Sequence, residues 1–285
     1  MTRFTFDRIG ESHVLLEGKV AVVTGSSTGI GKGTALRFAR EGASVVINGR
    51  RADRVHETAE EVRQAGGTVL EVSCDVTNAG DVDGLFEQTL KEFGKVDILV
   101  NNAVTPVNMG ERGPFLKMSA EGWHAFMQAN LGALFSCTQA AAKSMARQEI
   151  HGSIINISTI GASRAHRYTI AYDSMKGAID SFTRAVAVDL GPWGIRVNAI
   201  RPGPIMNEKR PNWGAPRPQP NAHVPLGRMG YPEDVAWAAV FLAADDAGFV
   251  TGQTFEVDGG LLAQARLPTD DEGKEIITPD NIGEY

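Results

Sequence analysis

Short apolar runs alternate along this chain with longer stretches in which apolar residues recur at helical spacing. Six of the runs are rich in valine and isoleucine and show little polar alternation: 19–24, 43–48, 68–73, 96–101, 153–158 and 195–200. A seventh candidate, 253–258, follows the last helical stretch. Strands have this composition when helices cover both of their faces, so the pattern predicts a parallel sheet of about seven strands between helices.

The helical stretches have recognisable ends. Gly42 follows one of them and is a typical helix stop. Ser119 is suited to cap a helix that runs towards Gln148, and Pro232 opens another that continues through Ala244. Strands and helices therefore alternate throughout, which predicts one α/β domain with a doubly wound (Rossmann-type) parallel sheet.

The expected domain spans residues 18–262, without an internal repeat or a clear interdomain linker. Residues 1–17 are an N-terminal extension, and 263–285 are a polar, acidic tail that either frays or packs on a neighbouring subunit. Residues 202–225 break the alternation and contain seven prolines. Such a segment is more often a functional lid than a connector, so we predict a lid here, with a rigid surface loop as the alternative.

Composition narrows the class of protein. Of 285 residues, 42% are hydrophobic and 22% charged, which suits a globular protein with a substantial core. The net charge of −6 disfavours nucleic acid or an anionic membrane as the main partner. Cys74 and Cys137 form neither a metal-ligand spacing nor a disulfide framework, and no metal site is expected. The N-terminus lacks the apolar centre of a signal peptide, and no apolar stretch approaches a membrane span. A cytoplasmic enzyme or binding protein is the expectation.

A glycine-spaced loop follows the first predicted strand and enters a helix, in the sequence Thr24-Gly25-Ser26-Ser27-Thr28-Gly29-Ile30-Gly31. Gly25 permits the turn, Gly29 allows close approach of a pyrophosphate, and Gly31 permits tight helix packing. The start of the helix offers unpaired N–H groups to phosphates. The loop therefore predicts a dinucleotide site, with a ligand-free turn as the alternative.

Tyr172 and Lys176 are four residues apart, well downstream of that loop. On a helix this spacing stacks both side chains on one face. A lysine ammonium there favours the phenolate and fits the tyrosine to give and take protons. Tyrosine and lysine are common on helices, so the pair gains its weight from its place in a nucleotide-binding chain.

Taken together, these motifs resemble those of the short-chain dehydrogenase/reductase family. The resemblance rests on Thr-Gly-x-x-x-Gly-x-Gly, Asn101-Asn102-Ala103, Tyr172-x-x-x-Lys176, Pro202-Gly203 and Val257-Asp258-Gly259-Gly260, and covers roughly residues 18–262. It implies hydride transfer between a nicotinamide cofactor and a small alcohol or ketone, in a protein that is commonly a dimer or tetramer; we predict a homotetramer. It does not indicate which alcohol or ketone. A non-catalytic nucleotide sensor or scaffold on the same fold is the alternative.

The resemblance also implies catalytic roles. Tyr172 is the expected general acid/base, Lys176 holds the nicotinamide ribose, and Asn130 anchors a water linked to the lysine. A hydroxyl must also orient the substrate carbonyl, and Ser158 and Thr159 compete for this role. Counting back from Tyr172 without a gap favours Thr159, whereas aligning on the following glycine favours Ser158.

The implied cofactor-binding residues, besides Tyr172 and Lys176, are Gly25, Ser27, Thr28, Gly29, Ile30, Gly31, Arg50, Arg51, Asp75, Val76, Asn102, Ala103, Pro202, Gly203, Ile205 and Asn207. Two positions depart from the family's pattern. Val104 stands where a glycine is usual and reshapes the wall near the nicotinamide, and Asn207 replaces the usual threonine.

The end of the second strand predicts which nicotinamide is used. NAD-specific relatives place an acid at the position of Gly49, and here the glycine is followed by Arg50 and Arg51. A guanidinium suits the 2′-phosphate of NADP, so the sequence predicts NADP. The alternatives are that both arginines are solvated loop charges and that NAD is used, since the glycine loop lacks a further basic residue.

Overall fold

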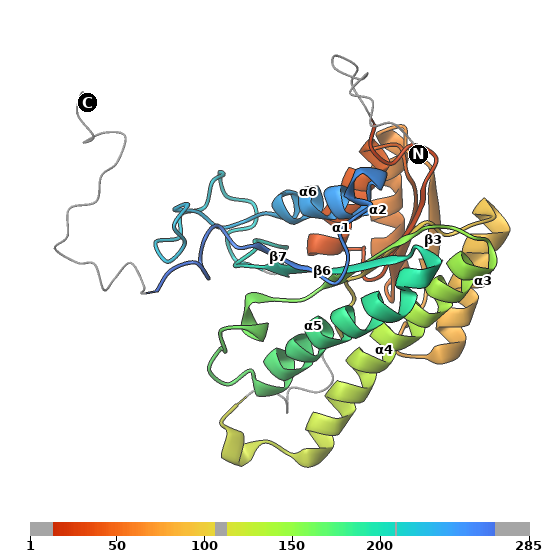
Figure 1. The fold of residues 1–285 in the computed structure, drawn as a ribbon. Helices are drawn as coiled ribbons and strands as arrows, with labels where there is room; N and C mark the ends of the chain where they lie inside the picture. The colour runs from red at the N-terminus through yellow and green to blue at the C-terminus, as the bar shows by residue number, and fades with distance from the viewer. Residues whose placement is uncertain (1–13, 106–112, 209, 266–285) are drawn as a thin grey trace.

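The computed structural model describes residues 14–105, 113–208 and 210–265. Seven parallel strands form one sheet in the order β3-β2-β1-β4-β5-β6-β7. Figure 1 shows this sheet between its helices. The strands are β1 (Val20–Val23), β2 (Ser44–Gly49), β3 (Val69–Ser73), β4 (Ile98–Asn101), β5 (Ser153–Ile157), β6 (Arg196–Pro202) and β7 (Thr254–Val257). The predicted doubly wound α/β fold is confirmed, with each strand within two residues of its predicted ends.

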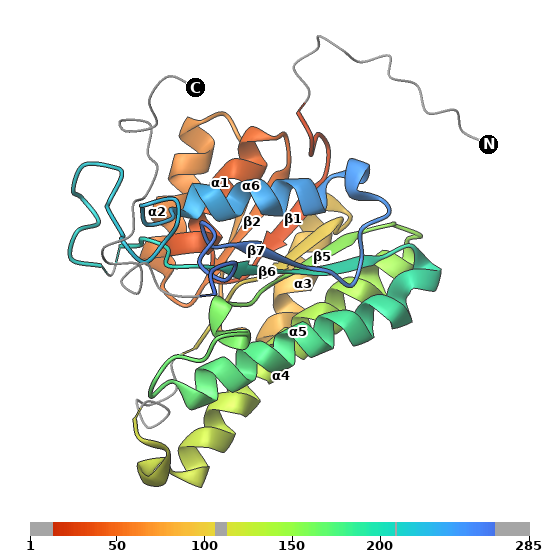
Figure 2. The same ribbon diagram turned by 60° about the vertical axis from the view of Figure 1, so that its left-hand side comes forward.

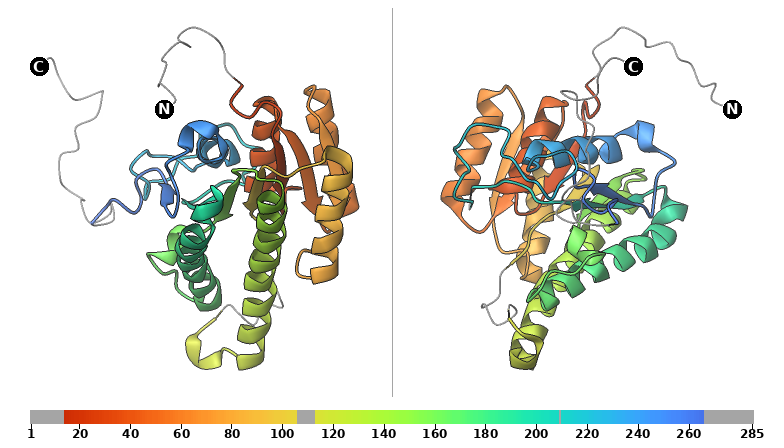
Figure 3. Two further views of the ribbon diagram at one scale, coloured as in Figure 1. Left: turned by 45° about the vertical axis from the view of Figure 1, so that its right-hand side comes forward. Right: turned by 90° about the vertical axis from the view of Figure 1, so that its left-hand side faces the viewer.

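Six α-helices of the described chain form two layers: α1 (Gly29–Arg40), α2 (Ala52–Gln64), α3 (Ala79–Phe93), α4 (Ala120–Arg147), α5 (Ile170–Leu190) and α6 (Pro232–Ala243). Apolar residues of α1, α2 and α6 form one core with one face of the sheet, and those of α3, α4 and α5 form a second core on the other face. Figures 2 and 3 show these layers, with α4 and α5 side by side.

Burial explains which strands are the most regular. Every residue of β1, β4 and β5 is buried, as a continuous apolar run predicts for a strand covered on both faces. The edge strands β3 and β7 are mostly half-buried instead, because each has a neighbour on one side only.

The helix ends follow from local chemistry. The hydroxyl of Ser119 accepts a hydrogen bond from the N–H of Gly122 at 3.0 Å and so caps α4. Gly42, just beyond α1, has a φ of +87° in the left-handed region that glycine adopts without strain. Leu16 is buried against the α1 layer, so ordered packing begins ahead of β1.

All seven strands run in the same direction, so their carboxyl ends share one edge of the sheet. From β1 the chain adds β2 and β3 on one side of the sheet and then β4 to β7 on the other, so the switch point lies between β1 and β4. In open α/β sheets ligands bind at such a switch point. The glycine loop follows β1, Asn102 follows β4 and Ser158 follows β5. The fold therefore brings the predicted site segments to one edge.

After β6, the described residues 203–208 and 210–225 form an irregular segment. Trp213 of this segment packs in a small apolar cluster with Met206, Met229 and Tyr231. The guanidinium of Arg217 stacks on the Tyr231 ring at 4.0 Å. Over the described part of the chain, no helix is long and apolar enough to cross a bilayer.

Candidate active site

The glycine loop after β1 has the backbone that its sequence predicts. Gly25 and Gly29 adopt left-handed φ values of +61° and +56°. At Gly31 a side chain is excluded, because a Cβ would lie 2.5 Å from the carbonyl oxygen of Gly25. The loop is therefore folded back tightly on the start of α1, the end of the helix whose first N–H groups have no partner within the helix.

Asn102 braces this loop from the neighbouring strand. Its Nδ2 donates to the carbonyls of Thr24 and Gly25 at 3.0 and 2.9 Å. The backbone N–H groups of Asn102 and Ala103 both donate to the hydroxyl of Thr24, at 3.0 and 3.1 Å. The family resemblance implies cofactor contact at Asn102 and Ala103, and the structure gives their polar groups a bracing role.

Asn48 supports the loop from the other side and was not predicted. Its Oδ1 accepts from the N–H of Gly25 at 3.3 Å, and its carbonyl accepts from the N–H of Ser26 at 2.8 Å. Asn48 is buried near the end of β2. An asparagine at the end of an otherwise apolar strand was the available signal, because a buried amide needs partners.

The two arginines after β2 differ in how firmly they are held. Arg51 is paired with Asp53 at 2.5 Å, at the start of α2. Arg50 lies 3.7 Å from Asp75 and is more than half exposed. A Cβ at Gly49 would lie 2.8 Å from the hydroxyl of Ser27, so an acid at this position requires that hydroxyl to move.

Tyr172 and Lys176 both lie on α5, as predicted. The Nζ of Lys176 is 5.7 Å from the centre of the Tyr172 ring and donates to the carbonyl of Ile157 at 2.5 Å. The lysine is 2% exposed. Burial lowers its pKa to about 8, and the nearby Asp180 opposes part of that change.

Ser158 and Thr159 use their hydroxyls differently. Ser158 is buried and donates to the backbone carbonyl of Lys176 at 3.3 Å. Thr159 accepts from the N–H of Gly161 at 3.4 Å and caps a short 3₁₀ turn, Ile160–Ala162. The Ser158 hydroxyl thus donates its proton to α5, whereas Thr159 accepts in its bond with Gly161 and keeps its proton available to a further acceptor.

Asn130 is buried, as its place beside the apolar stripe of α4 predicts. Its Oδ1 accepts from the N–H of Thr105 at 2.8 Å, and its Nδ2 donates to the carbonyls of Thr105 and Phe126 at 3.1 and 2.9 Å. The amide therefore ties the chain after β4 to α4.

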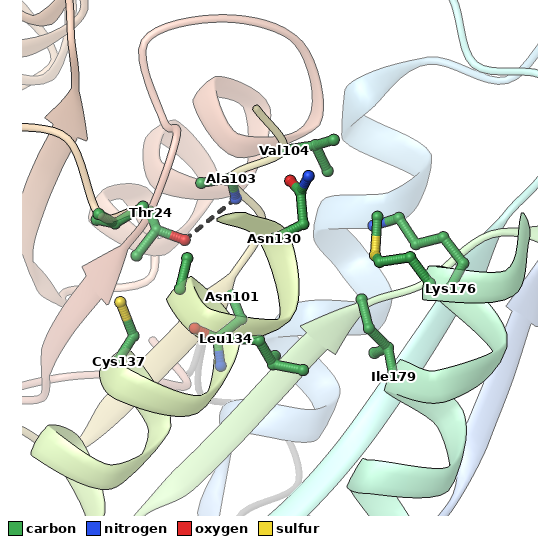
Figure 4. Close-up of a pocket in the computed structure, with 12 residues that line it drawn as sticks. Thr24, Asn101, Ala103, Val104, Asn130, Leu134, Cys137, Lys176 and Ile179 are labelled. Carbon is green, nitrogen blue, oxygen red and sulfur yellow. Dashed lines mark hydrogen bonds between the residues drawn. The ribbon is translucent and has the colours of Figure 1, made fainter. Parts of the chain in front are cut away.

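Asn130 and Lys176 line the same cavity, on facing helices (Figure 4). Its volume of about 20 Å³ is sufficient for one water molecule. Val104 lines it too. Burial raises the pKa of Cys137, another lining residue, to about 12, so its thiol stays protonated.

A chain of buried hydrogen bonds that begins at Asn101, a residue that lines the cavity, was not predicted. Asn101 donates to Thr138 and Asn156, each at 2.9 Å, and Asn156 donates to Thr183, also at 2.9 Å. These bonds join α4, which carries Asn130, and α5, which carries Tyr172, to β4 and β5, and Thr159 follows β5. The network fixes the relative positions of those elements.

The predicted cofactor residues after β6 are not all in the same cavity. Gly203 and Ile205 line a second cavity of about 470 Å³ with residues 224–226 and 256–260. A Cβ at Gly203 would lie 2.7 Å from the Cα of Asp258, so this glycine permits close packing against the turn after β7. Pro202 is buried at the end of β6, and Asn207 lies near Gly29, with its Cβ 3.7 Å from where a Cβ of Gly29 would be.

One group of metal-ligating side chains also comes together, away from the sheet edge. His56, Glu60 and Glu71 have ligand atoms within 4.8 Å of one another. Arg63 already pairs with Glu60 at 2.6 Å and with Glu71 at 2.7 Å. The two carboxylates that a metal would need are thus already paired with an arginine cation. We interpret this group as a surface ion-pair network.

The fold and the glycine loop match known nucleotide-dependent oxidoreductases. A family model described as enoyl-(acyl carrier protein) reductase matches residues 25–262. A solved structure of a short-chain type dehydrogenase/reductase from Mycobacterium marinum superposes with a TM-score of 0.79 at 33% identity, covering 88% of this chain and 98% of that one.

Two curated relatives are similar along most of the chain. The BbsD subunit of a hydroxy(phenyl)methylsuccinyl-CoA dehydrogenase from Thauera aromatica is 41% identical, over 86% of this chain and 97% of that protein. A 3-oxoacyl-(acyl-carrier-protein) reductase from Synechocystis is 39% identical, over 87% of this chain and 98% of that protein.

The chain belongs to the short-chain dehydrogenase/reductase family. It is an NAD(P)-dependent oxidoreductase that transfers a hydride between a nicotinamide cofactor and an alcohol or ketone. The alternative of a non-catalytic sensor or scaffold is not favoured, because the curated relatives are oxidoreductases.

Proposed function

We propose that Tyr172, Lys176 and Thr159 carry out the proton transfer that accompanies hydride transfer. The observation that carries this proposal is the burial of Lys176 on the face of α5 that Tyr172 shares, with its Nζ 5.7 Å from the tyrosine ring. A bound nicotinamide supplies or accepts the hydride. The Tyr172 hydroxyl gives a proton to the substrate oxygen or takes one from it, and the lysine cation favours the phenolate.

Thr159 is proposed to orient the substrate oxygen. This role needs a donor at the carboxyl end of β5, and the bonds of Ser158 and Thr159 support Thr159 as the residue with a proton to give. Asn130 is proposed to keep the wall of the site in place through Thr105. The cavity between Asn130 and Lys176 has room for one water, which would connect the lysine to further proton acceptors.

Acyl thioesters are the substrate class that we propose to test first. The names of the two curated relatives refer to a CoA derivative and to an acyl carrier protein. In this chain the loop between Thr159 and Tyr172 carries the exposed Arg164 and Arg167 and no acidic residue. A basic loop beside the site suits a substrate with a phosphate-bearing carrier.

The corresponding experiment is a panel of carbonyl compounds and alcohols, followed by the absorbance of the nicotinamide. The panel contains acetoacetyl-CoA, simple ketones, sugars and secondary alcohols. Preferential reduction of acetoacetyl-CoA supports the thioester proposal, and a preference for sugars or free alcohols rejects it. Failure to oxidise or reduce any member would argue against the catalytic assignment as well.

NADP is the proposed cofactor, held at its 2′-phosphate by Arg50. Arg50 is more than half exposed and its nearest acid is 3.7 Å away, whereas Arg51 is paired with Asp53. The glycine loop, the start of α1, Asp75, Val76 and the chain after β6 would hold the rest of the molecule. The backbone of Gly25 and Gly29 fits this role, since both are in the left-handed conformation and the N–H of Gly29 already binds a carboxylate.

Arg50→Ala should therefore lower the preference for NADP over NAD by about ten- to a hundredfold, because a charge-assisted hydrogen bond contributes about 1.5–3 kcal/mol. The measurement is kcat/KM with both cofactors in the wild type and the variant. Arg51→Ala is the matched control and should change the ratio little. A wild type that prefers NAD, with a ratio that Arg50→Ala leaves unaltered, would reverse the assignment.

A homo-oligomer, either a dimer or a tetramer, is proposed from two apolar surfaces. One lies along α4, α5 and the turn after α5 and the other near α6 and β7; the exposed residues are Phe135, Val188, Trp193, Trp237, Phe241 and Phe249. Large apolar side chains gathered on an exposed face are typical of interfaces between protein chains. Sedimentation equilibrium at micromolar concentration should give two or four times the chain mass, and a monomer would contradict the proposal.

A further inference from the structure

The carboxylate of Glu208 lies at the N-terminus of α1. Its Oε2 and Oε1 accept from the N–H of Gly29 at 3.0 and 3.2 Å. Glu208 belongs to the segment that follows β6, and no salt bridge to it is recorded among the described residues. A negative group from a distant part of the chain thus occupies the glycine loop at its helix end.

Local chemistry explains why a carboxylate is stable there. Thr28, the residue before α1, makes no side-chain cap bond, and the first turn of the helix contains no acidic residue. The exposed N–H groups and the positive end of the helix dipole therefore lack an anion of their own. Glu208 supplies this anion and acts as a cap from 179 positions away.

The same N-terminus is where a dinucleotide's pyrophosphate binds in this kind of fold. One N–H group does not serve two anions, and a carboxylate beside a pyrophosphate is repelled by it. The position that a Cβ of Gly29 would take is 3.7 Å from the Cβ of Asn207 and 4.0 Å from Oε2 of Glu208, so this part of the segment covers the glycine.

We propose that Glu208 is an internal competitor for the phosphate-binding end of the cofactor site. In the free enzyme its carboxylate holds residues 205–208 against the glycine loop, and the cofactor's pyrophosphate must displace it to bind. The position of the segment after β6 is thereby tied to whether the cofactor is present. This inference rests on the placement of the cofactor given under the proposed function.

With competition of this kind, the apparent Kd for the cofactor equals the Kd of the open site divided by the fraction of enzyme in which the site is open. A carboxylate that favours the closed position tenfold, or by about 1.4 kcal/mol, raises the apparent Kd about tenfold. A lower affinity also favours release of the oxidised or reduced cofactor after each turnover.

The first test is the binding of NADPH and NADH in the absence of substrate, followed by nicotinamide fluorescence. Glu208→Gln keeps the length and shape of the side chain and removes its charge, and it should lower Kd for both nucleotides about tenfold. Glu61→Gln is the matched control: Glu61 pairs with Lys32 of α1 at 2.7 Å and does not bond Gly29. It should leave Kd within about twofold if the effect is local rather than a change in net charge.

The second test uses the enzyme without cofactor. Loss of the carboxylate tether should expose the segment, so that chymotrypsin cleaves after Trp213 several times faster in Glu208→Gln than in the wild type. An unchanged or weaker affinity in Glu208→Gln, or equal cleavage rates, would overturn the inference. If the wild type, Glu208→Gln and Glu61→Gln bind neither nucleotide, it is the proposed cofactor site that fails instead.

Discussion

Tyr172→Phe should lower turnover by about a hundred- to ten-thousandfold, which is the usual contribution of a positioned general acid or base. Phenylalanine keeps the ring that packs beside Lys176 and removes the only proton that the side chain can transfer. Binding of the nicotinamide nucleotide should persist. The measurement is kcat with the best substrate of the panel, together with Kd for NADPH.

Tyr168→Phe is the matched control for this experiment. Tyr168 lies in the loop just before α5, is about half exposed, and its recorded hydrogen bond uses its backbone carbonyl, which accepts from the N–H of Gly113. Removal of its hydroxyl should change kcat by less than about twofold, in line with other exposed sites. Turnover of Tyr172→Phe within a few-fold of the wild type would remove Tyr172 from the catalytic assignment.

Thr159→Ala should lower kcat about a hundred- to a thousandfold, the effect of removing one donor that stabilises charge on the reacting oxygen. Thr159→Ser restores the hydroxyl and should recover most of the activity. Ser158→Ala removes a bond to the Lys176 carbonyl and should reduce stability by about 1 kcal/mol, with a smaller effect on kcat.

Measuring kcat and the midpoint of urea unfolding in all three variants separates the two hydroxyls. The geometry of Ser158 gives it a role in holding α5 to the end of β5, and the geometry of Thr159 leaves it a proton to donate. If Ser158→Ala loses more activity than Thr159→Ala, the assignment is reversed.

The sequence predicts the strands well because burial on both faces leaves a continuous apolar run. This holds for β1, β4 and β5, and less clearly for β3 and β7, whose exposed edges admit polar residues. Helix ends were predictable where the capping group is local, as at Ser119. The cap of α1 was not, because its acceptor, Glu208, is 179 positions away.

Distance along the chain also limits how far the site could be predicted. Motif spacing placed Tyr172, Lys176 and the glycine loop, since each depends on residues close in sequence. The bonds of the Asn102 amide to the Thr24 and Gly25 carbonyls could not be predicted in this way, because those partners are 78 and 77 positions away. Asn156 and Asn48 could be recognised only as buried amides in apolar strands, with partners that the fold supplies.

The burial of Lys176 makes the folding equilibrium itself sensitive to alkali. In the unfolded chain this lysine has an ordinary pKa of about 10.4, and in the folded protein burial lowers it to about 8. Between these values the unfolded state binds more protons, so the free energy of unfolding rises with pH through this window. Below about pH 8 the folded protein bears the whole free-energy cost of keeping the protonated Lys176 buried, about 3 kcal/mol. Above about pH 10.4 this cost disappears. Lys176, which we propose assists proton transfer, is thus a source of instability at neutral pH, and the two cores on either side of the sheet must outweigh it.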